Sequence, residues 1–161
     1  RMPRFWEEYD RGTSTFDEVV DELCRLTGRP REVCVGVMRE AINLQEPVAA
    51  TECLVGELKA AGYRLYVLSN MSREFIDYLR RFPVYALFDG EVVSCEELVV
   101  KPERRIYEIL LERYALQPAE TLFIDDRDAN ILAARALGIN GFRFDPHDAG
   151  TSCDALRRLL L

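Results

Sequence analysis

The chain has 161 residues, and 28 acidic side chains against 21 Lys and Arg give it a formal net charge of −7. This length suffices for one domain with a small appendage, and the hydrophobic fraction of 48% is ordinary for a globular protein. No apolar run approaches the ~18–20 residues of a membrane span, and the acidic balance argues against a nucleic-acid partner, whose phosphates need a basic face.

The first third of the chain shows only helical patterns. Thr15 and Glu18 form a capping box at the start of a helix predicted over 15–27. Further helices are predicted over 31–43 and over 47–61, each ending where the apolar periodicity stops. The apolar positions of the helix over 31–43 are Val33, Val37, Met38 and Ala41.

From residue 63 onward, strand patterns alternate with helix patterns. The strands are predicted over 63–68, 91–93, 121–124 and 141–144. The helices are predicted over 72–81, 102–114, 129–137 and 151–161. This alternation predicts an α/β fold, a doubly wound parallel sheet with helices on both faces. The chain therefore divides into a helical segment, residues 1–46, and an α/β core, residues 47–161.

Cysteine and lysine are used sparingly. Five scattered cysteines form no C-x-x-C pair, so we expect reduced thiols in a cytoplasmic protein. The basic residues are almost all arginine, and Lys59 and Lys101 are the two lysines of the chain. Lys59 lies in a polar helical stretch and is interpreted as a solvated surface charge.

Polar side chains stand where ligands bind in open α/β sheets, beyond the carboxyl ends of the strands. They comprise a hydroxyl, an amide, an ammonium group and two carboxylates. These residues are Ser69, Asn70, Lys101, Asp125 and Asp126. We expect them to gather at one edge of the sheet.

The two adjacent acids, Asp125 and Asp126, allow two interpretations. They offer the oxygen ligands that suit Mg²⁺, which takes one or two carboxylates and leaves positions for waters and substrate phosphate. Equally, they could cap the following helix and favour its dipole. Asn130, one helical turn further on, could steady the pair by hydrogen bonding or be a plain surface residue.

The other three residues are also ambiguous when taken singly. Ser69 and Asn70 precede a helix start, where free N–H groups bind anions, but they are also ordinary turn residues. Lys101 precedes Pro102, which holds it in the turn before a helix. A point charge there can bind a phosphate oxygen.

Taken together, these segments resemble the second, third and fourth motifs of the haloacid dehalogenase (HAD) superfamily of phosphohydrolases, in order and in spacing. The matching segments are 67–70, 100–107 and 123–138. Residues 6–16 resemble the helical cap of subfamily I, and their aromatic residues are interpreted as core. The strongest likeness is to sugar-phosphate phosphatases and to the phosphatase domain of soluble epoxide hydrolases.

The resemblance implies a HAD-like, Rossmann-like core with a small helical cap, and a Mg²⁺-dependent phosphomonoester hydrolase that works through an aspartyl-phosphate. Ser69 and Lys101 would hold the phosphoryl oxygens, and Asn70 would support that pocket. Asp126 would ligate Mg²⁺, with Asp125 positioned on the ion or on Lys101. The expected partner is a small phosphorylated metabolite, and a homodimer is an open possibility.

The first motif of this superfamily, a strand ending in Asp-x-Asp, is not found in the sequence. Asp10 has no strand pattern ahead of it and Asp17 lies inside a predicted helix, so neither fits as the nucleophile. We expect the motif upstream of residue 1, and the 161 residues alone to be inactive. Its strand would lie between those over 63–68 and 121–124, which should therefore be about two strand spacings, near 10 Å, apart instead of directly paired.

Other classes of protein place similar residues at strand ends. A response-regulator receiver domain uses similar groups, but its acidic pair comes first in the chain and its Lys-Pro last, the reverse of the order here. A dehalogenase shares the fold but typically offers Ser or Asn in place of Asp125 and Asp126. A phosphomutase, or a non-catalytic binding protein, stays open as an alternative.

Overall fold

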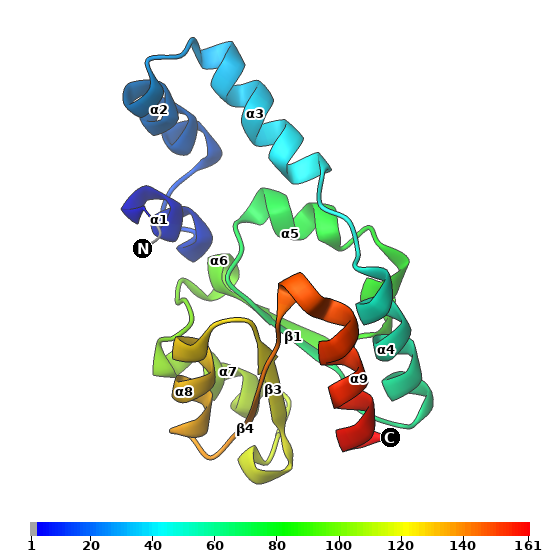
Figure 1. Cartoon of the computed structure of the whole chain (residues 1–161). Coiled ribbons are helices and arrows are strands. Elements are labelled where there is room, and N and C mark those ends of the chain that lie inside the picture. Colours follow the sequence, from blue (N-terminus) through cyan, green and yellow to red (C-terminus); the bar gives the residue numbers. More distant parts are fainter. Residues whose placement is uncertain (1–2) are drawn as a thin grey trace.

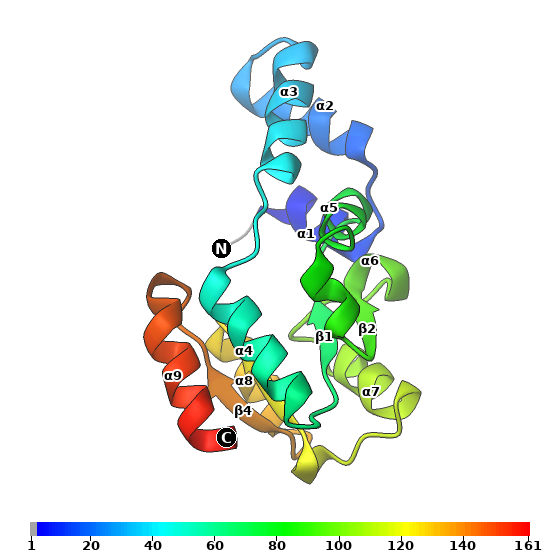
Figure 2. The same cartoon turned by 90° about the vertical axis from the view of Figure 1, so that its right-hand side faces the viewer.

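The structure, a computed structural model, describes residues 3–161, and its first part consists of three helices. They are α1 (Arg4–Arg11), α2 (Phe16–Thr27) and α3 (Arg31–Asn43). The capping box predicted at Thr15 and Glu18 is present. In both views α2 and α3 stand at the end of the molecule farthest from α9 (Figures 1 and 2).

A small apolar core holds the three helices together. Its buried members are Tyr9, Val19, Val20, Cys34 and Met38, against which Phe5, Trp6, Phe16 and Phe75 pack. The aromatic residues of this segment are thus core residues, as expected. The predicted apolar face of α3 was partly wrong, because Val33 and Val37 are exposed while Cys34, Met38 and Ile42 are buried.

The second part of the chain alternates strands and helices, as predicted. Its strands are β1 (Tyr66–Ser69), β2 (Gly90–Val93), β3 (Leu122–Asp125) and β4 (Asn140–Arg143). Its helices are α4 (Ala49–Ala60), α5 (Arg73–Leu79), α6 (Ser94–Glu97), α7 (Arg104–Arg113), α8 (Asp128–Arg135) and α9 (Ala149–Leu160). Helix α7 begins later than predicted because Glu103 is extended and forms its N-cap.

The strands form two parallel pairs. Strand β1 pairs with β2, with Ser69 opposite Val93. Strand β3 pairs with β4, with Asp125 opposite Arg143. Within residues 3–161, β1 and β3 do not pair with each other, which agrees with the expectation that these two strands are not direct neighbours.

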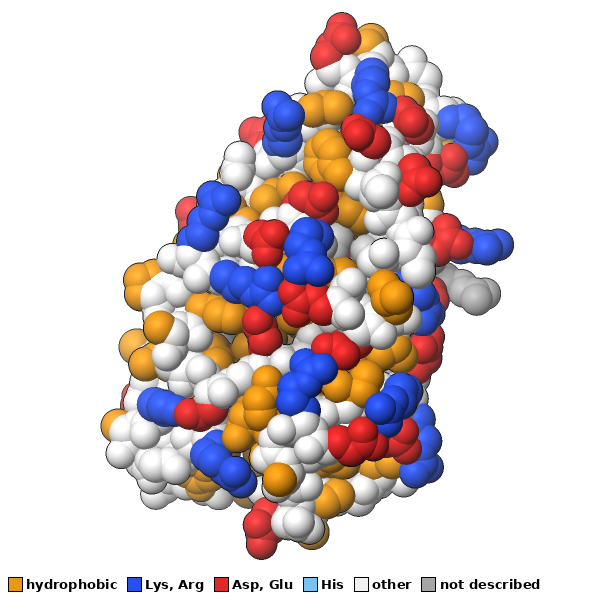
Figure 3. All heavy atoms as spheres, turned by 180° about the vertical axis from the view of Figure 1, so that it is seen from behind, with side chains coloured by type: hydrophobic (Ala, Val, Ile, Leu, Met, Phe, Trp, Pro, Cys, Tyr) orange, Lys and Arg blue, Asp and Glu red, His pale blue; other side chains and the backbone are white. Residues whose placement is uncertain are grey.

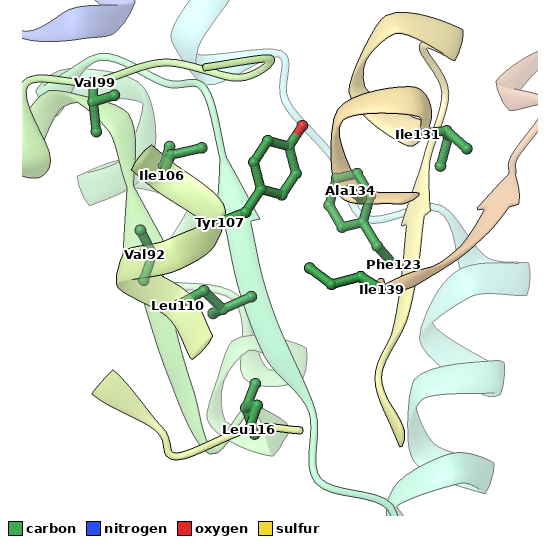
Figure 4. Close-up of a cluster of buried hydrophobic side chains, with 10 residues drawn as sticks. All are labelled: Val92, Val99, Ile106, Tyr107, Leu110, Leu116, Phe123, Ile131, Ala134 and Ile139. Carbon is green, nitrogen blue, oxygen red and sulfur yellow. The ribbon is translucent and has the colours of Figure 1, made fainter. Parts of the chain in front are cut away.

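Helices cover both faces of the strand pairs. Helices α7 and α8 pack on one face through a cluster that includes Val92 of β2 and Phe123 of β3, so it spans both pairs (Figure 4). Helices α4 and α9 pack together on the other face. Strand β3 is less enclosed than its apolar sequence predicts, because Ile124 is 38% exposed.

Charged side chains are spread over the surface and many are paired. Figure 3 shows Lys and Arg side chains lying beside Asp and Glu side chains on the face it presents. No helix among residues 3–161 combines the length and the apolar character needed to cross a membrane.

Candidate active site

The polar residues predicted to form the site lie at or near the carboxyl ends of β1 and β3. Ser69 is the last residue of β1, and Asp125 is the last residue of β3. Both ends are where an open parallel sheet binds its ligands. Lys101 lies in the segment before α7, and its side chain reaches the ends of both β1 and β3.

The ammonium group of Lys101 links the two strand pairs. Its Nζ donates hydrogen bonds to the carbonyl oxygen of Leu68, at 2.8 Å, and to Oδ2 of Asp125, at 2.7 Å. The side chains of Lys101 and Asp125 are 10% and 6% exposed, so this ion pair is largely shielded from water. Nζ also lies 5.4 Å from the centre of the Phe123 ring, within range of a cation–π interaction.

Asn70 fixes the backbone that carries Lys101. Its Nδ2 donates to the carbonyl oxygen of Lys101 at 2.9 Å, and its Oδ1 accepts from the backbone N–H of Lys101 at 2.7 Å. These two bonds act like one rung of a β-ladder between segments 31 residues apart in the chain. The orientation of Lys101 therefore depends on Asn70.

Asp125 is held by three donors. Besides the bond from Lys101, its Oδ1 accepts from the backbone N–H of Arg127, at 2.8 Å, and from Nδ2 of Asn130, at 2.9 Å. Such hydrogen bonds stabilise the charged carboxylate in a buried place. The bond to Lys101 is one of the two positions that the sequence left open for Asp125.

Asn130 is fixed in turn by the core beneath it. The phenol of Tyr107 donates to its carbonyl oxygen at 3.0 Å. Burial raises the pKa of Tyr107, and the negative charge of Asp125 adds to this, so the phenol stays a donor. Asn130 is itself buried, and its Oδ1 has no hydrogen-bond partner among residues 3–161.

Ser69 and Asp126 lie beside this network without joining it. Within residues 3–161 neither side chain makes a hydrogen bond or an ion pair that would occupy it. Asp126 is exposed, in contrast to its buried neighbour Asp125. The structure thus gives the two adjacent acids different surroundings, one paired and buried, the other open to water.

Asp10 and Asp17 belong to other surroundings. Asp17 pairs with Arg31 on the surface of α2 and α3. Asp10 lies at the end of α1, where burial raises the pKa of its carboxyl group from 3.8 to about 6. No described hydrogen bond or ion pair joins either carboxylate to Lys101.

Several contacts around the site carry no sequence signal of their own. The pairing of Asn70 with the backbone of Lys101, and that of Tyr107 with the backbone of Asn130, depend on segments that approach only in the folded chain. The end of α1, a helix that the sequence pattern did not indicate, bonds Ser94, whose hydroxyl also binds the backbone after Asn70, and bonds Glu103 in the turn that carries Lys101.

Comparison with known proteins gives concordant matches. A family model described as haloacid dehalogenase-like hydrolase matches residues 3–138. The sesquiterpene phosphatase astK of Aspergillus oryzae is 31% identical over 156 residues, which cover 96% of this chain and 79% of that protein.

Solved structures match across nearly the whole chain as well. A predicted HAD-like family hydrolase from Porphyromonas gingivalis superposes with a TM-score of 0.80 at 28% identity, covering 98% of this chain and 80% of that one. A HAD family enzyme from Bacteroides thetaiotaomicron, solved as a mutant in complex with magnesium and inorganic phosphate, superposes with a TM-score of 0.74. Its 22% identity, over 90% of this chain and 75% of that one, supports the fold alone.

The strand pairs, the polar groups at their carboxyl ends and these matches agree with one another. The family model alone covers far more than half of the sequence. The chain therefore belongs to the haloacid dehalogenase-like hydrolases.

Proposed function

We propose that this hydrolase cleaves phosphomonoesters of a small phosphorylated metabolite, with Mg²⁺ as its cofactor. The observation that carries the proposal is the position of Lys101, whose ammonium group lies at the ends of both β1 and β3. A lysine at such a point binds a phosphoryl oxygen as a point charge. The hydroxyl of Ser69, at the end of β1, supplies a further donor to the same group.

Asp126 is the residue that best fits a magnesium ligand. Mg²⁺ is usually bound by one or two carboxylates together with waters and substrate phosphate. Asp126 is exposed and has no hydrogen-bond or ion-pair partner among residues 3–161, whereas Asp125 accepts from three donors and supports the site through Lys101. No group of three acidic, His or Cys side chains suited to a metal occurs among residues 3–161, so the remaining ligands would come from outside these residues, waters and substrate phosphate among them. When bound, the ion would neutralise charge on the phosphoryl group.

We further propose that the nucleophile is an aspartate on a strand that enters between β1 and β3. Each of these strands has a described partner on one side only, and unpaired backbone groups in the middle of a sheet are costly. Such a strand would cover Ile124, which is 38% exposed. Among residues 3–161, the buried Oδ1 of Asn130 also lacks a hydrogen-bond partner, so it is available to a donor from a further segment.

The proposed reaction follows from these groups. An aspartate oxygen attacks phosphorus and the ester P–O bond breaks, while a second acid gives its proton to the leaving alcohol. The same second residue then takes a proton from water, which attacks phosphorus, breaks the aspartyl P–O bond and releases inorganic phosphate, so that both side chains return to their starting states. Lys101 and Ser69 would bind the phosphoryl oxygens throughout, and stabilising this charge supplies most of the catalysis in phosphoryl transfer.

The proposal extends to substrate selection and to cellular location. Similarity to the sesquiterpene phosphatase supports phosphatase chemistry. We propose that α1, α2 and α3 form a cap that selects the substrate. All five cysteines are free thiols in the structure, which supports a cytoplasmic location. A homodimer stays a prediction.

The proposal is tested with the full-length protein and a generic phosphate ester such as p-nitrophenyl phosphate. We expect hydrolysis that chelation of Mg²⁺ abolishes, and its near-complete loss in Lys101→Ala. The Asp126→Asn variant should need a much higher Mg²⁺ concentration to reach the same rate of hydrolysis. Asp128→Asn is the matched control, because Asp128 lies nearby in the first turn of α8 but pairs with Arg143. Full activity in Lys101→Ala or in Asp126→Asn would refute the assignment of the site.

A further inference from the structure

The last residues of α1 together with its C-cap, residues 9–12, which we call the α1 anchor, contact the core close to the candidate site. Tyr9 is buried, and its phenol donates to Oε2 of Glu74 at 2.7 Å across 65 residues of sequence. Glu74 lies in the first turn of α5, which follows Ser69 and Asn70. The α1 anchor therefore begins against the element that continues from the end of β1.

Ser94 joins the α1 anchor to the residue after Asn70. It is completely buried at the start of α6, and its Oγ accepts the backbone N–H of Met71 at 2.9 Å. The same hydroxyl donates to the carbonyl oxygen of Asp10. One side chain thus ties the backbone of α1 to the turn that carries Asn70.

Arg11 ties the α1 anchor to the turn that carries Lys101. Its guanidinium binds the carboxylate of Glu103 through two bonds, Nη2 to Oε1 at 2.5 Å and Nη1 to Oε2 at 3.1 Å. Glu103 is the N-cap of α7, and its backbone N–H donates to the carbonyl oxygen of Val100. Lys101 is enclosed in this turn, so a shift of Glu103 would move Lys101.

The fit at Gly12 leaves little room for movement. Gly12 adopts φ +81°, and a Cβ placed on it would lie 2.4 Å from the carbonyl oxygen of Cys95. The α1 anchor is therefore in close contact with the backbone of α6. It bridges two turns that are already joined by the Asn70–Lys101 bonds.

We infer that Arg11 is a positioning residue, which holds the turn of Lys101 in register with the turn of Asn70 through its paired bonds to Glu103. Its effect on catalysis rests on the proposed function, but its effect on the two turns does not. The competing explanation is that Arg11 only fastens α1 to the core. Exposed ion pairs contribute little to global stability, so loss of Arg11 should loosen the turns without unfolding the protein.

The chain offers a matched control in the pair of Arg157 and Glu57. This pair is also bidentate, at 2.6 and 3.2 Å, also joins distant elements, and is similarly exposed. It links α9 to α4, on the face opposite α7. Arg157→Ala therefore removes the same kind of interaction without touching the turns of Asn70 and Lys101.

The experiment compares amide hydrogen exchange in the full-length protein and its variants. The reporters are the N–H groups of Lys101 and Met71, which are bonded to Asn70 and Ser94. In Arg11→Ala we expect their exchange to rise about fivefold or more through local opening, with amides of β4 unchanged. Arg157→Ala should leave both reporters as in the wild type.

Two further variants keep the test decisive. Arg11→Lys keeps the charge but lacks the fork that binds a carboxylate at two points, and it should show an intermediate rise without risk to folding. The exchanged pair Arg11→Glu with Glu103→Arg should restore slow exchange. Wild-type exchange at Lys101 in both Arg11→Ala and Arg11→Lys would overturn the inference, and so would a rise that spreads evenly over the whole protein.

Activity is a separate readout. In an active wild type, Arg11→Ala should lower kcat for p-nitrophenyl phosphate several-fold and Arg157→Ala should not. An unchanged kcat would overturn the role of Arg11 in catalysis. If the wild type hydrolyses no phosphate ester, the proposed function fails, while the exchange of the Lys101 amide still decides whether Arg11 positions the turns.

Discussion

Removal of the ammonium group of Lys101 tests the ion pair on which the candidate site depends. Lys101→Met keeps the length and the apolar stem of the side chain but leaves Asp125 as a buried carboxylate without its cation. The carbonyl oxygen of Leu68 loses a donor as well. Asp125 would keep the hydrogen bonds from Arg127 and Asn130.

The expected cost follows from these contacts. Breaking a buried ion pair by removing one partner costs about 3–5 kcal/mol. Because two donors to Asp125 are left, we expect a value near the lower end, about 3 kcal/mol. Adding Asp125→Asn removes the stranded charge and keeps an acceptor for the two donors, so the double variant should recover about 1–2 kcal/mol of this loss.

Urea denaturation followed by circular dichroism measures these free energies of unfolding. The other lysine gives the control, because Lys59 pairs with Asp89 at 2.6 Å but both side chains are about one third exposed. Lys59→Met should therefore cost less than about 1 kcal/mol. The reasoning is refuted if Lys101→Met costs no more than Lys59→Met, or if Asp125→Asn destabilises the Lys101→Met protein further.

Two more predictions concern the end of α1. Burial raises the pKa of Asp10 from 3.8 to about 6, so the folded state favours the protonated carboxyl group and loses stability as pH rises from about 4 to about 6. With a discount for its partial exposure, Asp10→Asn should be more stable than the wild type by about 1–2 kcal/mol at pH 7. That gain should vanish near pH 4 in urea titrations, and a gain independent of pH would contradict it. Gly12→Ala should cost about 2–4 kcal/mol, from the left-handed conformation and from overlap with Cys95. Gly28→Ala, with φ +66° and nothing within 4 Å, should cost about 1–2 kcal/mol; thermal melts that show equal losses would refute the packing argument.

The sequence was informative wherever a short segment carried its own signal. The apolar run before Asp125 and the β-favouring run before Ser69 each predicted a strand with a polar residue at its end, and the structure has both. These signals are local, because a buried strand must be apolar and a strand end must be polar to serve a ligand. The capping box at Thr15 is local in the same way.

The sequence was uninformative where a contact depends on tertiary approach. Whether Asp125 would lie on a metal ion or on Lys101 could not be decided, because both interpretations need the same residue types. Helix α1 has only eight residues, which is shorter than the window over which helical periodicity can be judged. Its position is set by distant partners such as Glu74 and Glu103.

The exposed face of α3 is a third case. Val33 and Val37 lie one helical turn apart, as do Cys34 and Met38, so two neighbouring apolar stripes share one helix. Periodicity alone cannot say which stripe is buried. The packing of Cys34 and Met38 against Tyr9, Val19 and Val20 decides it in the structure.

The charges of the candidate site lead to a final prediction about metal dependence. The positive charge of Lys101 is balanced by the negative charge of Asp125. With the carboxylate of Asp126, these three side chains carry one net negative charge. A phosphate ester brings roughly −1.5 to −2 more at pH 7, and this group of residues alone would repel it. A divalent cation held by Asp126 reverses the sign and makes binding favourable.

Titration calorimetry with inorganic phosphate should therefore detect binding with Mg²⁺ and little or none with a chelator. Asp126→Asn should bind phosphate with less dependence on Mg²⁺, because it removes both the metal ligand and the repelling charge. Equal phosphate affinity of the wild type with Mg²⁺ and with a chelator would show that Lys101 is not neutralised as the structure indicates.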